Sequence, residues 1–275
     1  MNTFTRINGF SKPLPMVLTG IAAAFFLGVS TVVTSAAVPT TPGAPDDFGY
    51  KFAVSSDTTQ YNFIDLINLP QDSVVHTASA LLNQDDAAQN IDIGFGFVYY
   101  ATTYTSCFPS TNGEIVFGAS SVDYSPEPIF GPELPHNYIA PFFTDLTTLT
   151  SPAPVPTIKY ATLGAAPNRI CVVQWQDMQQ YAYAANRMTF QVQLYEGSNE
   201  IRFVYKTSPA FTAVSYKAIS IGIEGPTAFP TGLQYLFGHQ GDSISLAGKA
   251  IMITRPVKVT VESKYTRPDL SLIHI

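Results

Sequence analysis

The sequence predicts an all-β fold, a sandwich of many short antiparallel strands, and three observations support this prediction. Hydrophobic and polar residues alternate in several segments, most strictly over residues 91–99 and 188–194, and a period of two is typical of a strand with one buried face. Turn signals such as Asn112-Gly113 separate these segments at short intervals. No amphipathic helix longer than about ten residues is expected beyond the N-terminal segment. Short strands with frequent turns favour a β-sandwich.

The composition supports one large core and argues against a nucleic-acid partner. The chain has 275 residues, of which 46% are hydrophobic and only 12% are charged, and it contains 19 Phe and 15 Tyr. That is enough apolar material for a packed sheet domain. The formal net charge is −6, and no cluster of Lys and Arg is present to bind phosphates.

The N-terminal residues predict export from the cell. Residues 1–37 have the pattern of a signal peptide: Arg6 and Lys12 are basic, residues 16–33 are apolar, and small residues follow at 35–37. The alternative is an uncleaved membrane anchor, which would be the chain's only membrane contact. Export would place the protein outside the cell, at the cell surface or in a periplasm. The Pro-rich residues 38–47 are expected to be a linker before a domain at 48–255.

The first half of this domain is expected to hold short strands at 50–54, 61–66 and 74–82, followed by the strictly alternating segment 91–99. A strand at 104–108 should return through Asn112-Gly113 to residues 115–117. Four prolines mark residues 120–135 as a surface loop, and residues 138–143 form a short apolar strand that ends near Asp145.

The second half is more regular. Strands are expected at 157–163, 169–175, 188–195, 201–206, 219–223 and 251–253, and a turn at 197–199 makes a hairpin with one buried and one wet face. Residues 256–275 alternate weakly, and they can be an edge strand, a segment that pairs with another chain, or a partly ordered terminus.

The two cysteines, Cys107 and Cys171, both fall in predicted strands. An exported protein with an even number of cysteines is most simply expected to contain one disulfide, which would stabilise the fold by roughly 4 kcal/mol through loop closure. The alternative is a pair of buried free thiols. Their spacing excludes a CxxC redox or metal motif.

Five phrases in order connect the chain to a known family: FGFVYYATTYTSCFPSTNGEIVFG, then IAPFFTDL at 139–146, CVVQWQDM at 171–178, TFQVQLYEGSNEIRFVY at 189–205 and IGIEGPTAFPTGLQYLF at 221–237. They resemble the nidogen-like extracellular β domain found in secreted bacterial proteins, over about residues 48–254. The chain departs from the family at Tyr100-Ala101, where a Gly is common, and at Thr111, where the turn usually has Ser. The resemblance implies an adhesion, matrix or surface-display module and brings no catalytic residue set.

The leading hypothesis is therefore a non-catalytic binding or adhesion module whose partner is an extracellular protein or a glycan. A hydrolase is the least favoured alternative, because the chain has no Gly-x-Ser-x-Gly nucleophile motif. No cofactor is expected, with calcium as the one candidate. Asp85, Asp86 and Asp145 are its candidate ligands, because Ca²⁺ takes carboxylate oxygens from loops; the alternative is acidic turn residues facing solvent.

A carbohydrate-binding, lectin-like module is the second hypothesis. Tyr181 and Tyr183 lie in a loop-like stretch next to two glutamines, and exposed aromatic rings can stack on sugars. His136, in the Pro-rich loop, is a further candidate for ligand binding because of its loop position. Trp175 follows apolar strand residues and is expected to lie in the core.

Overall fold

The computed structural model describes residues 45–55, 61–70, 73–129, 131, 134–149, 153–208, 218–226, 232–238 and 245–255. The predicted signal peptide at 1–37, most of the predicted linker at 38–47 and the segment 256–275 lie outside these described residues. No helix within the described ranges is long and apolar enough to cross a lipid bilayer.

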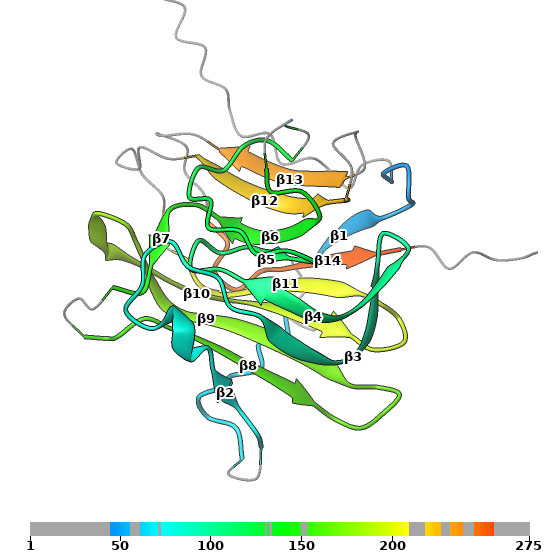
Figure 1. Ribbon diagram of the computed structural model, residues 1–275, viewed down its shortest axis with the longest axis horizontal. Coiled ribbons are helices and arrows are strands. Elements are labelled where there is room, and N and C mark those ends of the chain that lie inside the picture. Colours follow the sequence, from blue (N-terminus) through cyan, green and yellow to red (C-terminus); the bar gives the residue numbers. More distant parts are fainter. Residues whose placement is uncertain are drawn as a thin grey trace, which may run out of the picture. The chain divides into compact units, whose positions relative to one another are not determined.

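Two antiparallel sheets form the domain, which confirms the predicted all-β sandwich (Figure 1). The eight-stranded sheet has the order β1-β14-β11-β10-β9-β8-β2, and β7 also pairs with β9. Its strands are β1 (Lys51–Ser55), β2 (His76–Thr77), β7 (Leu146–Thr147), β8 (Thr157–Leu163), β9 (Ile170–Gln180), β10 (Tyr183–Tyr195), β11 (Ile201–Thr207) and β14 (Ala250–Thr254).

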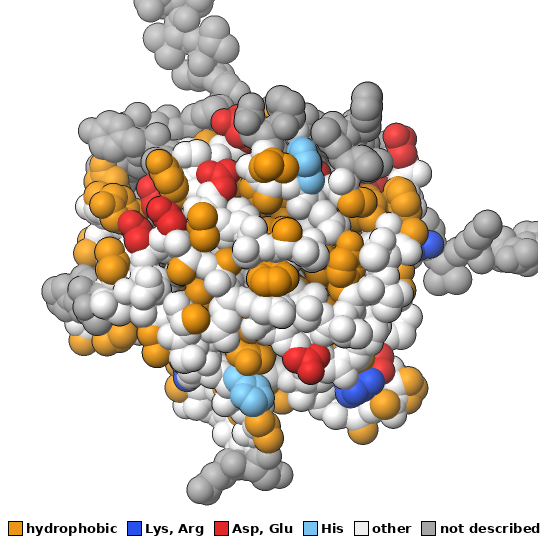
Figure 2. All heavy atoms as spheres, viewed as in Figure 1, with side chains coloured by type: hydrophobic (Ala, Val, Ile, Leu, Met, Phe, Trp, Pro, Cys, Tyr) orange, Lys and Arg blue, Asp and Glu red, His pale blue; other side chains and the backbone are white. Residues whose placement is uncertain are grey.

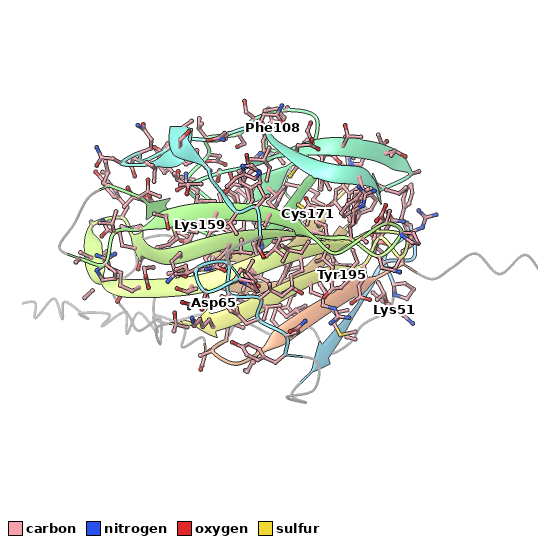
Figure 3. All side chains as sticks on the ribbon, turned by 90° about the horizontal axis from the view of Figure 1, so that it is seen from below. Lys51, Asp65, Phe108, Lys159, Cys171 and Tyr195 are labelled. Carbon is pink, nitrogen blue, oxygen red and sulfur yellow. The ribbon has the colours of Figure 1, made fainter. Side chains whose placement is uncertain are left out.

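The six-stranded sheet has the order β13-β12-β6-β5-β4-β3. Its strands are β3 (Ile91–Tyr99), β4 (Thr102–Pro109), β5 (Ile115–Val116), β6 (Tyr138–Phe143), β12 (Ile219–Glu224) and β13 (Gly232–Gly238). In Figure 3 the layer that carries Phe108 lies above the layer that carries Lys159 and Tyr195. One 3-10 turn, η1 (Ser79–Leu81), is the only helical element among the described residues.

The main core lies between the two sheets, as the alternating segments predict. Along β3 the five odd-numbered hydrophobic residues are buried, whereas Asp92, Gly94 and Gly96 are exposed. Trp175 is fully buried, as expected, and stacks on Phe190 with ring centroids 5.0 Å apart. Its indole Nε1 donates a hydrogen bond to the Ser110 carbonyl oxygen at 2.9 Å, so the ring's one polar atom is satisfied inside the core.

The strand predicted at 61–66 is wrong, because these residues lie across the outer face of the eight-stranded sheet without pairing as a strand. Glutamine side chains on that face accept the hydrogen bonds that a neighbouring strand's backbone would otherwise accept. Gln174 Oε1 accepts a bond from Leu66 N at 3.0 Å, and Gln191 Oε1 accepts one from Ile64 N at 3.2 Å. The polar face of the sheet is therefore covered by chain instead of water. The strand predicted at 74–82 is likewise reduced to β2 and η1.

The Asn112-Gly113 turn joins β4 to β5, as predicted, but its loop spans residues 110–114 and is buried. Gly113 has φ +84°, and a Cβ at this position would lie 2.3 Å from the Phe142 carbonyl oxygen. Only glycine combines this left-handed conformation with so close a backbone approach. The predicted turn is therefore packed against β6.

The predicted disulfide is wrong, because the structure contains no bond between Cys107 and Cys171. Cys107 on β4 and Cys171 on β9 are free, fully buried thiols in the main core. Burial raises the pKa of Cys171 to about 12 and that of Cys107 well above its ordinary value. An apolar interior keeps both sulfurs protonated and unreactive, which matches the alternative of two buried thiols.

Candidate functional site

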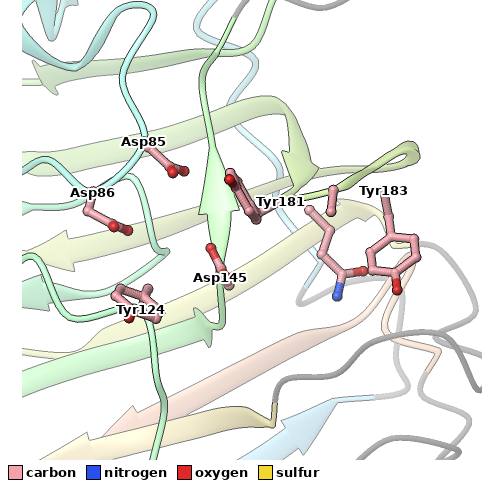
Figure 4. A pocket seen from close by; sticks show the side chains of 8 residues that line it. Asp85, Asp86, Tyr124, Asp145, Tyr181 and Tyr183 are labelled. Atoms are coloured by element: carbon pink, nitrogen blue, oxygen red, sulfur yellow. The ribbon is translucent and has the colours of Figure 1, made fainter.

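A pocket of about 450 Å³ opens where the loop at 83–87, the start of β7 and the turn between β9 and β10 meet (Figure 4). It is lined by Asp85, Asp86, Tyr124, Asp145, Gln180, Tyr181, Ala182 and Tyr183. The structure thus brings the three candidate calcium ligands together with the two candidate ligand-binding tyrosines. We call this site the acidic pocket.

The three carboxylates converge in the acidic pocket. Each of Asp85, Asp86 and Asp145 offers one oxygen within 4.8 Å of the others, and Figure 4 shows the first two pointing from one loop towards the third. None of the described residues that line the pocket is Lys or Arg, and in Figure 2 acidic side chains gather beside hydrophobic ones on this face. The pocket is therefore strongly negative and suited to a positive charge.

The close approach of the three carboxylates has its clearest effect on Asp85. Its Oδ1 atom is buried and has no hydrogen-bond partner among the described residues. Burial raises the pKa of Asp85, the charge of Asp86 raises it further, and a hydrogen bond with Thr147 opposes the rise. A cation bound between the carboxylates would relieve both the desolvation and the repulsion.

Asn112 fixes the positions of the elements around the acidic pocket. Its fully buried side chain donates from Nδ2 to Asp86 Oδ1 at 2.9 Å and to the Asp123 carbonyl at 3.0 Å. Its Oδ1 accepts a bond from the backbone N–H of Leu146 at 3.0 Å. One amide therefore ties the Asp86 loop to the chain immediately after Asp145 and to the segment that leads into Tyr124.

The loop that carries Asp85 and Asp86 is also anchored by threonines. The carbonyl of Gln84 accepts bonds from Thr148 N at 2.9 Å and from Thr147 Oγ1 at 3.0 Å. Thr111 Oγ1 donates to the Asp85 carbonyl and accepts a bond from Ala87 N at 3.0 Å. These contacts preform the acidic side of the pocket, so a ligand would not need to order it.

Tyr181 lies in the tight turn at residues 181–182, and Tyr183 directly follows this turn. Leu146 pairs with Gln180, and Tyr181 N donates to the Asp145 carbonyl at 3.0 Å, so pairing between β7 and β9 sets the turn beside Asp145. The exposed fraction of Tyr181 is 46%, which confirms the predicted exposure of this residue. Tyr183 is the first residue of β10 and is partly buried.

His136 does not join the acidic pocket. It lines a second pocket of about 780 Å³, to which Tyr124 also contributes, and its Nδ1 lies 2.5 Å from Glu224 Oε1. Burial raises the pKa of Glu224 to about 7, against a lowering by His136. The pairing of His136 with a buried carboxyl gives it a structural partner inside the fold.

The roles of three residues in this region were not predicted from the sequence. Tyr124 lines both pockets, Asn112 positions the acidic one, and Glu114 is fully buried beside them. Neither carboxyl oxygen of Glu114 has a hydrogen-bond partner of normal geometry among the described residues. Burial raises the pKa of Glu114 to about 8, and the nearby Ser110 side chain opposes part of this rise. The Asn-Gly signal marked this turn, but a turn signal does not reveal that the loop is buried.

Comparisons with known proteins agree with the fold. No curated protein and no solved structure matches the chain. A family model described as NIDO related matches residues 49–261, which covers both sheets and every residue of the acidic pocket. The chain therefore belongs to the nidogen-related (NIDO-related) family.

Proposed function

We propose that this protein is an exported, non-catalytic binding module and that the acidic pocket is its ligand site. Membership of the nidogen-related family indicates an extracellular β module. The observation that carries the proposal is the convergence of Asp85, Asp86 and Asp145 with Tyr181 and Tyr183 around one pocket. Its volume of about 450 Å³ lies within the range of pockets that hold small ligands or single side chains of a partner.

The proposal includes a calcium ion bound by the three carboxylates. Ca²⁺ takes six to eight oxygen ligands in a flexible geometry, so three carboxylates would leave positions open for oxygens of a ligand. Two observations on the described part of the chain support a cation at this place: Asp85 Oδ1 is buried without a hydrogen-bond partner there, and the described lining contains no Lys or Arg. In this role calcium would connect the protein to its ligand without any chemical step.

The ligand could be a protein surface, as an adhesion role requires, but one observation favours a carbohydrate. Tyr181 is 46% exposed and lies in a concave site next to carboxylates. Aromatic faces stack on sugar rings, while carboxylates accept hydrogen bonds from the sugar hydroxyl groups and a bound cation coordinates their oxygens. A lectin-like mode is therefore the second candidate function, and it uses the same residues as the first.

A binding screen of the exported chain, with calcium and with a chelator, tests the proposal. The panels would be a glycan array and a set of extracellular matrix and cell-surface proteins. We expect a calcium-dependent ligand whose binding is lost in Asp145→Asn and in Tyr181→Ala. Tyr181→Phe should retain binding if the ring stacks on the ligand, and Asp47→Asn, at an exposed acid outside the pocket, serves as the matched control.

Each outcome bears on a different part of the proposal. A glycan ligand supports the lectin-like mode, and a protein ligand without a glycan supports adhesion. Binding that persists unchanged in both Asp145→Asn and Tyr181→Ala would exclude the acidic pocket as the ligand site.

A further inference from the structure

The second pocket combines exposed apolar side chains with few polar groups. It measures about 780 Å³ and is lined by residues 116–124, 134–137 and 226, and we call it the apolar pocket. Three large side chains of its lining are well exposed: Val122 by 54%, Tyr124 by 45% and Leu134 by 73%. Exposed apolar side chains grouped around one cavity mark an interaction site. A mostly apolar cavity of this size is typical of sites that bind small molecules.

Hydrogen bonds hold the walls of the apolar pocket in place. Asn137 Nδ2 donates to the Phe117 carbonyl at 2.8 Å and to Tyr104 Oη at 2.9 Å, and Phe117 N donates to the Asn137 carbonyl at 3.0 Å. Asn137 N in turn donates to the Gly225 carbonyl at 2.9 Å. The two sides of the pocket are therefore joined before anything binds in it, and a ligand would not need to order them.

His136 supplies a polar group to this apolar lining. Its Nδ1 lies 2.5 Å from Glu224 Oε1, and the two side chains are only 17% and 6% exposed. Its other ring nitrogen, Nε2, has no hydrogen-bond partner within the described part of the chain. A hydrogen bond at one nitrogen fixes the orientation of an imidazole ring. Glu224 therefore holds the ring, and Nε2 is the nitrogen left for a ligand in the pocket.

The charges of the lining favour a neutral ligand. Asp123 is an acidic residue of the described lining, which contains no Lys or Arg. The Oδ1 atom of Asp123 accepts a hydrogen bond from Ser125 N at 2.9 Å, so this carboxylate is stabilised within the fold. An anionic ligand would lie near Asp123 without a lysine or arginine of the described lining to balance its charge.

We propose that the apolar pocket binds a neutral aromatic alcohol whose hydroxyl group forms a hydrogen bond with His136 Nε2. This goes beyond the binding function proposed for the acidic pocket, because the site is separate and its chemistry is different. A hydroxyl group both donates and accepts, so it matches Nε2 whether or not that nitrogen carries the proton. The rings of Phe117 and Tyr124 in the lining can pack against an aromatic ligand.

Equilibrium binding of three naphthalene probes to the purified protein, followed by probe fluorescence, tests this inference. 2-Naphthol should bind about fivefold more tightly than naphthalene, because its hydroxyl group gains one hydrogen bond. A cavity without a polar anchor gives the opposite order, since the hydroxyl group then loses its water without a replacement. 2-Naphthoate should bind more weakly than 2-naphthol because of its negative charge near Asp123.

Two variants separate the hydrogen bond from the apolar contacts. His136→Phe keeps an aromatic ring but removes both nitrogens, so the fivefold preference for 2-naphthol should disappear while naphthalene still binds. Leu134→Glu places a charge in the apolar lining and should weaken both probes by about tenfold. Because Leu134 is so exposed, this variant is expected to fold normally. Val74→Glu, at a residue 67% exposed and outside the described lining, is the matched control and should change neither affinity.

The same measurements can overturn the inference. No binding of 2-naphthol by the wild-type protein, or tighter binding of naphthalene or 2-naphthoate, would contradict it. A preference for 2-naphthol that persists in His136→Phe, or affinities that Leu134→Glu leaves unchanged, would place the probe elsewhere. Calcium binding at the acidic pocket is measured separately, so the failure of either proposal leaves the other standing.

Discussion

Two turns of this domain each contain a residue with positive φ, Gly113 in one and Ala182 in the other, but they differ in burial. The loop at 110–114, which contains Asn112 and Gly113, is buried, and its side chains and carbonyls bind β6, β7 and the Asp86 loop. The turn at 181–182 is solvent-exposed and lines the acidic pocket. The buried turn fixes the positions of the elements around the acidic pocket, whereas the exposed turn supplies side chains that line it. Substitutions should therefore change stability at the first turn and binding at the second.

Gly113→Ala should have the largest effect on stability. The new Cβ would clash with the Phe142 carbonyl at 2.3 Å, and φ +84° is unfavourable for alanine. We expect a loss of about 4 kcal/mol in the free energy of unfolding, measured by urea denaturation. Gly248→Ala has a similar φ of +73° but open space around the new Cβ, and it should cost only about 1 kcal/mol. Equal losses would show that the close approach to Phe142 is unimportant.

Asn112→Ala should be the next most damaging change. It removes three hydrogen bonds, one of them fully buried, and leaves their partners on Asp86, Asp123 and Leu146 without that amide. We expect a loss of about 3 kcal/mol in stability, together with weaker ligand binding at the acidic pocket. Asn168→Ala, in an exposed loop, is the control and should change neither. A fully stable Asn112→Ala with wild-type binding would contradict the anchoring role of this residue.

Glu114 predicts a pH dependence of stability. Its pKa is raised by burial from an ordinary 4.5 to about 8, so the folded state holds a proton that the unfolded state releases. Its contribution is complete below about pH 4.5 and is lost as pH rises through about 8, by roughly 3–4 kcal/mol between pH 5 and pH 8. Glu114→Gln should flatten this part of the profile, as followed by urea denaturation at each pH. An unchanged slope would assign the dependence to other groups.

Ala182→Gly should have the smallest effect and the opposite sign. Ala182 has φ +61° in the exposed turn, where glycine avoids the strain of a Cβ. We expect a gain of up to about 1 kcal/mol in thermal or urea stability, reduced by the greater freedom of glycine in the unfolded chain. A clear loss of stability would mean that the alanine methyl group makes packing contacts that outweigh the backbone strain.

Strand prediction succeeded where side-chain alternation and burial agree, as along β3 and β10. It failed at residues 61–66, because buried glutamines on the sheet take over the role of a neighbouring strand, which no local pattern reveals. The exposure of Tyr181 and the grouping of Asp145 with Asp85 and Asp86 were predicted. The sequence did not predict that Tyr181 and these three carboxylates line one pocket. That arrangement depends on pairing between β7 and β9 and on the hydrogen bonds of the buried Asn112 amide.

The most direct test of the central proposal is a calcium titration of the purified protein by isothermal calorimetry. The convergence of Asp85, Asp86 and Asp145 within 4.8 Å predicts one calcium site per chain. Its affinity should fall by about tenfold or more in Asp145→Asn and remain unchanged in Asp47→Asn. No calcium binding by the wild-type chain, or equal binding by wild type and Asp145→Asn, would contradict a cation site in the acidic pocket.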